Sequence, residues 1–331
     1  MNRSTPRSPI VGLSTRYATT LDKNFLARAL CLYDSWRELV PGGDFGFYCM
    51  DQESVRVLER LAPERAVIVP HDQFATDELR ATRQTRSMAE YCWSSKPAIL
   101  LHSLKERPGL DWAVYLDSDM MFFGDANRAL SRDMDYLVTP HRFSPEFESY
   151  RAPVGNYNAG YVAFRNSTPG REALGWWMAR CLEWCGSVPA PDKYADQKYL
   201  DDLPRLFGGV VPEIKGLNAA PWNIDNYTVT TRGGRVEVDD EALLLFHFQG
   251  FRIHGRSLHD MYSGNRRLRE EVVEHIYRPY VRRLARCIDR VRRAGGDSRW
   301  GIDSFARRPR LLYHHGRKLL RGTSNLTWVV A

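Results

Sequence analysis

Short apolar runs alternate with longer segments of helical periodicity along the first 250 residues of the chain. The apolar runs have strand length and stand at residues 10–14, 47–50, 66–69, 112–116, 136–139, 161–164 and 243–246. Between several of them, apolar residues recur at three- and four-residue steps, most clearly at 23–39, 87–105 and 171–185. Strands that alternate with helices in this way indicate a mostly parallel sheet with helices on its faces, so the predicted fold class is α/β.

The pattern changes beyond residue 260, which divides the chain into a body at 1–260 and a basic helical extension at 261–331. Tyr280, Leu284, Ile288 and Val291 recur on one side of a predicted helix, and arginines fill the rest of its surface. From residue 278 onward there are 14 Lys+Arg against 3 Asp, whereas the preceding 277 residues hold 33 Lys+Arg against 37 Asp+Glu. The basic character of the protein therefore belongs to the extension.

Two interpretations of the extension stay open. Its helix packs on the body with its charges in water, or the segment 279–321 lies on an anionic membrane surface, where basic residues mixed with leucines are typical. A nucleic-acid partner is not expected, because the basic residues alternate with aliphatic residues and not with aromatic residues that stack on bases.

Length, composition and cysteine spacing narrow the class of protein. The chain has 331 residues, of which 43% are hydrophobic, so it can bury a large core. Its first residues show no apolar signal segment, and no apolar run approaches the roughly 20 residues that span a bilayer. The six cysteines form no CxxC pair and no zinc spacing. These features predict a cytoplasmic protein, attached at most peripherally to the inner face of a membrane.

An acidic pair ends the buried strand predicted at 112–116. Asp117 and Asp119, separated by Ser118, follow it directly, at the edge of the sheet where open α/β folds bind ligands. Asp-x-Asp sequences are common in solvated turns, and that interpretation stays open on this stretch alone. Two carboxylates held together at such an edge favour a hard divalent cation with oxygen ligands, and with it a phosphate-bearing substrate.

The acidic pair stands in an ordered series of motifs that resembles a known family. A Lys-Pro helix at 87–105 comes first, then Tyr-Leu-Asp-Ser-Asp at 115–119, Tyr-Asn-Ala-Gly-Tyr at 157–161, Asp-Gln at 196–197 and Leu-Phe-His-Phe-Gln-Gly at 245–250. Residues 8–255 thereby resemble the GT-A nucleotide-diphosphosugar transferases, most closely the retaining glycosyltransferases of family 8 and their bacterial relatives. The resemblance implies a Rossmann-like, mixed but mostly parallel sheet flanked by helices, with 1–260 as the catalytic domain.

The resemblance implies a metal centre made by Asp117, Asp119 and His247. Two carboxylates and a neutral imidazole suit Mn²⁺ better than Mg²⁺, although either ion fits the oxygen ligands. Taken alone, a histidine that follows an apolar strand is more often a hydrogen-bonded core residue.

The resemblance also implies the residues that handle the donor, a nucleotide-diphosphate sugar and in particular a UDP-sugar. Asn158 and Asp196 match positions that hydrogen-bond the donor sugar, and Gln197 matches the residue beneath the anomeric carbon, so Asp196 and Gln197 are the expected catalytic residues. The expected reaction transfers the sugar with retention of configuration to a glycan or lipid-linked acceptor.

Six further residues are expected to contact the donor. Lys96 and Arg86 are candidates for the diphosphate, or else solvated helix positions. Tyr17, expected in a polar turn, stacks on the nucleobase or only packs.

Ser118, Gly250 and Arg252 complete the expected set. The family carries a lysine where this chain has Ile253, and either the neighbouring Arg252 replaces its phosphate contact or the loop differs here. The family's Pro-Trp after that lysine is absent as well, and this departure weakens the expectation of retention more than that of glycosyl transfer.

Two other functions remain open on the sequence. One is a non-catalytic protein that binds an anionic surface or nucleic acid through its tail, on a decayed sugar-nucleotide fold. The other is a sugar nucleotidyltransferase, which is expected to carry a glycine-rich basic loop after its first strand. Residues 14–20 contain no glycine, which disfavours the second alternative.

Overall fold

A computed structural model of the chain describes residues 12–209, 211–255, 257–303 and 310–328. Its centre is a six-stranded sheet with the order β3-β2-β1-β4-β7-β6. The strands are β1 (Thr15–Leu21), β2 (Asp44–Cys49), β3 (Ala66–Pro70), β4 (Trp112–Leu116), β6 (Tyr136–Pro140) and β7 (Tyr157–Arg165). The first four are parallel, and β7 is antiparallel to both β4 and β6. The mixed, mostly parallel sheet that was expected is confirmed.

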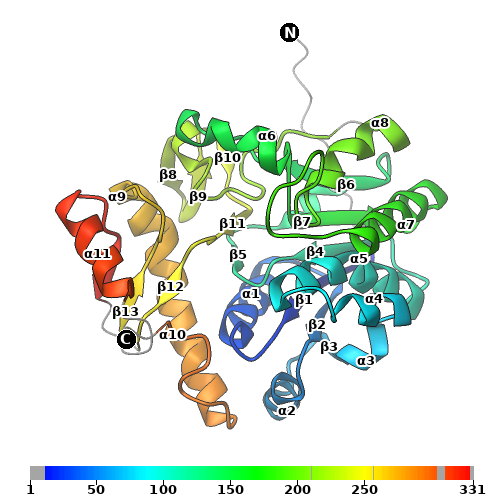
Figure 1. The fold of residues 1–331 in the computed structure, drawn as a ribbon, viewed down its shortest axis with the longest axis horizontal. Helices are drawn as coiled ribbons and strands as arrows, with labels where there is room; N and C mark the ends of the chain where they lie inside the picture. Colours follow the sequence, from blue (N-terminus) through cyan, green and yellow to red (C-terminus); the bar gives the residue numbers. More distant parts are fainter. Residues whose placement is uncertain (1–11, 210, 256, 304–309, 329–331) are drawn as a thin grey trace.

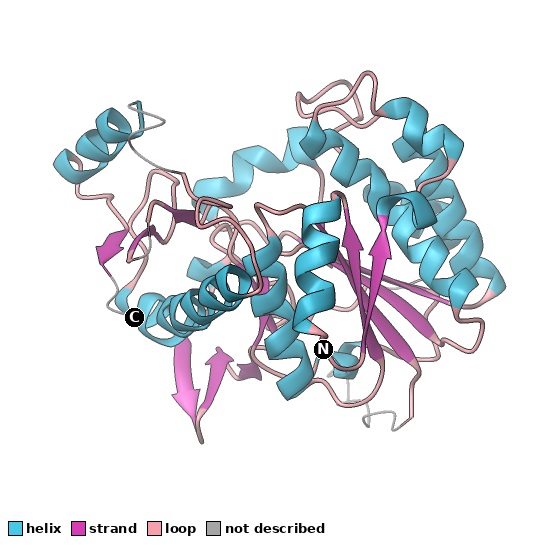
Figure 2. Ribbon diagram, turned by 90° about the horizontal axis from the view of Figure 1, so that it is seen from below, coloured by secondary structure: helices cyan, strands magenta, loops and turns pink. Residues whose placement is uncertain are grey.

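Helices cover both faces of this sheet and form two separate hydrophobic cores (Figure 1, Figure 2). One face carries α1 (Leu26–Leu39) and α2 (Gln52–Leu61). The other carries α3 (His71–Phe74), α4 (Asp77–Thr82), α5 (Met88–Glu106), α7 (Thr168–Glu183) and α8 (Leu203–Phe207). Side chains alternate between the faces along each strand, so that Tyr17 packs in the first core and Ala18 in the second.

The first strand lies further along the chain than the apolar pattern indicated. Ile10 and Val11 are outside the described residues, and the strand begins at Thr15, in the segment that was expected to be a polar turn. Its polar residues are buried because they have partners: the Arg16 guanidinium is 2.7 Å from Asp44 on the neighbouring strand. Paired polar groups can therefore occupy a central strand at little cost.

Smaller elements complete the body beside the main sheet. β5 (Met120–Phe122) pairs with β11 (Leu245–His247), and β8 (Val229–Arg232), β9 (Arg235–Val238) and β10 (Glu241–Ala242) form a meander. β8 and β9 form a hairpin that turns at Gly233 and Gly234. Short helical turns are α6 (Arg151–Val154) and the 3-10 segments Ala126–Ala129, Pro145–Tyr150, Lys198–Asp202 and Ile224–Asn226.

The C-terminal extension is helical, as expected. The body ends with β12 (Arg252–Ile253) and β13 (Leu258–Asp260), and the extension contains α9 (Glu270–Val272), a π-helical turn at Val273–Tyr277, α10 (Arg278–Arg293), α11 (Arg310–Leu320) and β14 (Leu326–Trp328). β14 pairs with β13, so one small sheet joins the two sides of the proposed domain boundary at 260. The boundary itself stays a prediction.

The apolar side of α10 is buried against α1 and belongs to the first core. Tyr280 and Leu284 have no exposed surface, and Arg283 and Arg290 form ion pairs with Glu38 and Asp34 of α1. The residues that suggested a membrane-facing helix at 279–291 therefore serve helix packing. None of the helices in the described part of the chain has the length and apolarity needed to cross a bilayer.

Candidate active site

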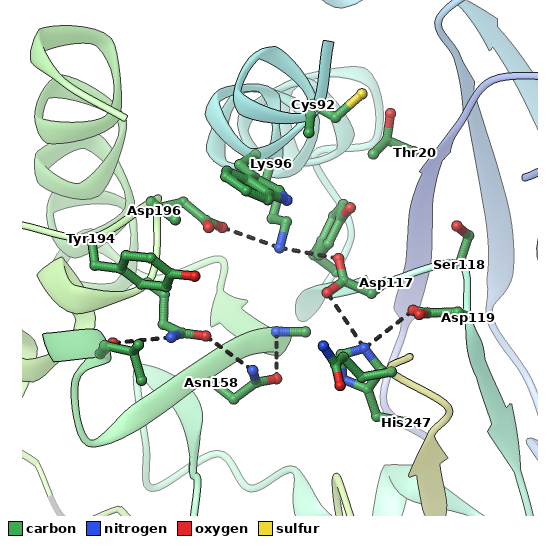
Figure 3. Close-up of a pocket in the computed structure, with 18 of the residues that line it drawn as sticks. Thr20, Cys92, Lys96, Asp117, Ser118, Asp119, Asn158, Tyr194, Asp196 and His247 are labelled. Atoms are coloured by element: carbon green, nitrogen blue, oxygen red, sulfur yellow. Dashed lines mark hydrogen bonds and ion pairs between the residues drawn. The ribbon is translucent and has the colours of Figure 1, made fainter. Parts of the chain in front are cut away.

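A cavity of about 600 Å³ opens at the carboxyl ends of β1 and β4. Residues from distant parts of the chain line it: Thr20 at the end of β1, Lys96 on α5, Asp117 after β4, Gln197 and His247. Figure 3 shows Lys96, Asp117, Asp119, Asp196 and His247 turned toward one another around this space. The acidic pair thus lies at the sheet edge at which it was expected.

Asp117, Asp119 and His247 meet on one side of the cavity. The His247 Nε2 atom is 3.1 Å from Asp119 Oδ1 and 3.9 Å from Asp117 Oδ2. One ligand atom from each residue lies within 4.8 Å of the other two. The pairing of β11 with β5 explains this convergence, because it sets His247 opposite Met120, the residue after Asp119.

Gly160 leaves the space that the His247 ring occupies. A Cβ atom at this position would stand 2.8 Å from His247 Nδ1 and Cε1 and 2.6 Å from Asn158 Oδ1. The Gly160 carbonyl meanwhile accepts a hydrogen bond of 2.8 Å from the Asp117 amide. Glycine is therefore required here by the close approach of backbone and imidazole.

The electrostatics of the three residues suit a divalent cation. Burial raises the pKa of Asp119, but the nearby His247 outweighs burial and lowers it overall. Burial likewise lowers the pKa of His247, and the attraction of Asp119 more than reverses this, so the net pKa is raised. The carboxylates thus draw positive charge to this point, and His247 Nδ1 is buried with no hydrogen-bond partner among the described residues. Two carboxylates and an imidazole fit Mn²⁺ well and Mg²⁺ acceptably.

Lys96 lies between two carboxylates at the back of the cavity. Its Nζ atom is 3.0 Å from Asp117 Oδ1 and 3.1 Å from Asp196 Oδ2, and it donates to the Ala159 carbonyl at 3.1 Å. Burial lowers the pKa of Lys96, but the attraction of Asp117 and Asp196 prevails and raises it overall. Burial raises the pKa of Asp196 to about 6 in spite of Lys96. The ammonium therefore stays charged and holds both carboxylates toward the cavity.

A buried amide network fixes the wall opposite the acidic pair. Asn158 Nδ2 donates to Gln197 Oε1 at 3.0 Å, and Gln197 Nε2 donates to the Val154 carbonyl at 3.0 Å. Asn218 Nδ2 donates to Asn158 Oδ1 at 3.0 Å. These bonds hold the Gln197 amide in one orientation at the cavity surface. Asn158, Asp196 and Gln197 are thus brought together, as the sequence predicted.

Two of the expected donor contacts lie elsewhere. The Tyr17 ring is fully buried in β1 between Trp36 and Phe122, and its hydroxyl donates to Asn127 at 2.9 Å, so the expected turn position and stacking on a base are wrong. Arg86 donates to the Leu182 carbonyl at 2.6 Å and to Ser94, and it does not line the cavity.

The loop at 250–252 also turns away from the cavity. Gly250 has a φ of +81° and packs near Tyr262, so it is needed for the turn, while its neighbour Gln249 lines the cavity. Arg252 forms an ion pair of 3.0 Å with Asp303 in the extension. Arg252 is thus paired with the extension and does not line the cavity, and its contact with phosphate stays a prediction. Ser118, in contrast, lines the cavity as expected.

Several lining residues had no signal of their own in the sequence. Asp22 and Phe25 follow β1, and Met88 and Trp93 lie on α5; all four line the cavity. Phe25 and Met88 are 42% and 43% exposed, which leaves a flat apolar surface open to a planar ring. These residues come together only because β1 and α5 are neighbours in the fold. Only the position of Asp22 at the carboxyl end of a strand could have indicated them.

Aromatic residues from the segment 141–156 also line the cavity. Phe143, Phe147 and Tyr150 stand beside Trp222 and Tyr262, and the Phe143 ring stacks on His141 at 4.4 Å between centroids. The Tyr150 side chain is 54% exposed. This wall offers broad apolar faces, which suit the apolar side of a sugar ring.

Known proteins are similar to this chain in two ways, some in structure and others in sequence. No family model matches the chain. Among solved structures, the galactosyltransferase LgtC in complex with donor and acceptor sugar analogs overlaps 71% of this chain and 87% of its own, with 16% identity and a TM-score of 0.47. Mouse xyloside xylosyltransferase 1 overlaps 72% of this chain and 98% of its own, with 13% identity and a TM-score of 0.43.

Two curated proteins of Bacillus subtilis are similar in sequence over most of their length. YfnF, an uncharacterized protein, is 32% identical over 251 residues, which are 73% of this chain and 83% of YfnF. YfnD, also uncharacterized, is 33% identical over 261 residues, 77% of this chain and 84% of YfnD. The chain therefore belongs to the family of YfnF and YfnD.

Proposed function

We propose that this protein is a metal-dependent glycosyltransferase of the GT-A class that uses a nucleotide-diphosphate sugar, in particular a UDP-sugar. One observation carries the proposal: Asp117, Asp119 and His247 converge at the carboxyl end of a buried strand, inside a cavity of about 600 Å³. A cavity of this size accommodates a nucleotide sugar together with part of an acceptor. The order of the motifs along the chain supports the same class and its retaining family 8.

The metal ligands in this proposal are Asp117, Asp119 and His247. An ion bound there supplies Lewis-acid charge against the diphosphate, which becomes more negative as the bond to the anomeric carbon breaks. Lys96 adds a fixed, desolvated positive charge 3.0 Å from Asp117. Its position is rigid because its three hydrogens point to two carboxylates and one carbonyl.

The nucleobase is proposed to lie against Phe25, Met88 and Trp93, with Asp22 in reach of its polar edge. These residues line the same cavity as Asp117 and Ser118, and Asp22 and Phe25 follow β1. They take the place of Tyr17 in the account of base binding.

The donor sugar is proposed to lie between Lys96 and the buried amides. Asp196 accepts hydrogen bonds from sugar hydroxyls when it is ionised, above its pKa of about 6. The Gln197 amide faces the anomeric carbon. Because an amide is a weak nucleophile, we propose attack by the acceptor hydroxyl on the face that the diphosphate leaves. The new bond joins the acceptor oxygen to the anomeric carbon, the bond to phosphate breaks, and the hydroxyl proton passes to the departing phosphate oxygen. Configuration is retained.

The acceptor is proposed to enter along the aromatic wall of Phe143, Phe147 and Tyr150. A glycan or a lipid-linked sugar presents the ring faces that such a wall binds. Attachment to an anionic membrane at its cytoplasmic side is proposed to use α11, because the apolar side of α10 is buried in the first core. Leu312, Tyr313, Leu319 and Leu320 of α11 are 59%, 71%, 62% and 90% exposed.

The direct test is a screen of nucleotide sugars against the purified full-length chain with and without Mn²⁺. One donor is expected to raise the melting temperature only when Mn²⁺ is present and to be hydrolysed slowly without an acceptor. Asp240→Asn serves as a control, because it alters an exposed carboxylate outside the cavity and is expected to keep the Mn²⁺-dependent shift. No metal-dependent shift with any nucleotide sugar would overturn the proposal.

A further inference from the structure

A second cluster of metal-binding residue types lies where the end of the body meets the C-terminal extension, and none of its three residues lines the cavity. His254 follows β12, Asp260 ends β13, and His315 lies on α11. All three are buried, with 7%, 0% and 4% of their surface exposed. One ligand atom from each lies within 4.8 Å of the other two. In Figure 1, α11 (red) stands alongside β13.

The two imidazoles face each other through their Nε2 atoms at 3.1 Å. His254 Nδ1 is 2.8 Å from the Asp303 carbonyl, and a carbonyl only accepts, so this nitrogen carries the hydrogen. In its neutral form, His254 therefore presents the lone pair of Nε2 to His315. Imidazoles that ligate metals are oriented in the same way, because their other ring nitrogen donates to a carbonyl or carboxylate.

Asp260 is held in place by groups outside the histidine pair. Lys318 Nζ is 3.1 Å from Asp260 Oδ2 and donates to the Tyr262 carbonyl at 2.8 Å, and the Tyr262 amide donates to Asp260 Oδ1 at 3.3 Å. His315 Nδ1 lies 3.9 Å from Asp260 Oδ2. A carboxylate oriented by outer hydrogen bonds beside two facing imidazoles is the arrangement of a preformed ligand set.

We propose that His254, His315 and Asp260 form a binding site for a divalent transition metal ion, in particular Zn²⁺. Imidazole nitrogen with one carboxylate oxygen is a donor set that zinc accepts in tetrahedral geometry. Two nitrogens bound to a tetrahedral zinc at about 2.05 Å lie about 3.3 Å apart, close to the separation of the two Nε2 atoms. The ion takes the place of the single proton that the two Nε2 atoms otherwise share.

Lys318 sets the strength of this site. Its ammonium shares the Asp260 carboxylate with the ion, so the two positive charges repel each other in buried surroundings. Removal of that charge leaves Asp260 to the ion alone, and metal affinity then rises. The Lys318→Met variant is therefore expected to bind Zn²⁺ more tightly than the wild-type chain.

The consequence of the site is structural. His315 is 61 residues from His254 in the sequence, so an ion shared between them fastens α11 to the β12–β13 hairpin. Because the exposed leucines of α11 share a helix with His315, the ion also fixes their orientation. This role requires neither a nucleotide sugar nor an ion at Asp117 and Asp119.

The test measures Zn²⁺ stoichiometry by equilibrium dialysis of the full-length, untagged chain after a chelator has removed all metal. The variants are His315→Gln, the neighbouring and exposed His314→Gln, and Lys318→Met. The wild-type chain and His314→Gln are expected to bind one more equivalent of Zn²⁺ than His315→Gln. The same difference is expected in an Asp119→Asn background, which separates this site from the proposed active site.

Equal stoichiometry in the wild-type chain and His315→Gln would overturn the proposal, and so would an equal loss in His314→Gln, which would indicate surface binding. If His315→Gln does not fold, crystals of the wild-type chain soaked in Zn²⁺ decide the matter. An anomalous peak between His254 and His315 is expected, and its absence would contradict the site.

Discussion

Two clusters in this protein contain carboxylate, histidine and a buried lysine, and they differ in their access to solvent. In the cavity cluster, the Asp117 and Asp119 side chains are 26% and 21% exposed and face a space of about 600 Å³. In the second cluster, made by His254, Asp260 and His315, the Asp260 and His315 side chains are 0% and 5% exposed. Similar ligand sets thus suit different tasks: an ion in the first can meet a substrate, and an ion in the second can only hold the chain together.

The largest expected difference between the clusters concerns turnover. Asp119→Asn is expected to lower turnover roughly 10³-fold or more, because the metal contributes several kcal/mol of charge stabilisation. His315→Gln is expected to leave turnover within a few-fold of the wild-type value. Initial rates of sugar transfer or donor hydrolysis measure both. A large loss of turnover in His315→Gln with normal Asp119→Asn activity would reverse the assignment of the two clusters.

The second comparison concerns the two buried lysines and the free energy of unfolding. Lys96→Met leaves Asp117 and Asp196 without their shared cation and is expected to destabilise the fold by about 3–5 kcal/mol. Lys318→Met leaves only Asp260 unpaired, and Lys318 lies on α11, a helix that can open locally, so a smaller loss is expected. Urea denaturation in the presence of a chelator measures both. Adding Asp196→Asn to Lys96→Met should recover part of the loss, and no recovery would show that Lys96 acts by packing alone.

The third comparison concerns pH and two buried histidines, His141 under the cavity and His259 on β13. Burial lowers the pKa of His141 from 6.5 to about 3 and that of His259 from 6.5 to about 4. Below pH 6.5 these histidines bind protons in the unfolded chain but not in the folded chain. Their contribution to the free energy of unfolding is therefore complete above pH 6.5 and is lost as the pH drops below it. Each of the two histidines lowers the free energy of unfolding by about 1.4 kcal/mol per pH unit between pH 6.5 and its pKa in the folded protein.

Denaturation between pH 7 and pH 4.5 is expected to show a shallower fall for His141→Gln and for His259→Gln than for the wild-type chain. The exposed His314→Gln serves as the control and should follow the wild-type slope. A wild-type slope in both buried variants would mean that these imidazoles are protonated in the folded protein.

The smallest expected effect concerns α11 and membranes. Leu319→Ser with Leu320→Ser is expected to reduce sedimentation with anionic liposomes by several-fold, because it removes two exposed apolar side chains beside Arg317 and Arg321. The control is Leu206→Ser, an exposed leucine on α8. Equal sedimentation of the double variant and the wild-type chain would leave α11 without a role at a membrane.

The sequence predicted the sheet and its acidic edge because both depend on local patterns. Trp112 to Leu116 is a continuous apolar run, and the carboxylates that end it have one natural position in an α/β fold. The first strand was misplaced because Thr15, Arg16 and Thr19 read as polar, and only pairing with Asp44 and neighbouring strands allows their burial.

The site could be predicted only where a motif carried it. Lys96 and Arg86 were equal candidates in the sequence, and the fold separates them. Lys96 points into the cavity between two carboxylates. Arg86 instead donates hydrogen bonds to Ser94 and to the Leu182 carbonyl of α7. Phe25 and Trp93 line the cavity because β1 and α5 are neighbours in the fold. No local sequence pattern predicts that contact.

The central claim is that the cavity cluster binds a nucleotide diphosphate through a metal ion. The most direct measurement is isothermal titration of UDP into the full-length chain with Mn²⁺, in chelator without Mn²⁺, and into Asp119→Asn with Mn²⁺. The account predicts binding to the wild-type chain that requires Mn²⁺ and is lost in Asp119→Asn. Binding of equal strength without Mn²⁺, or in Asp119→Asn, would contradict it.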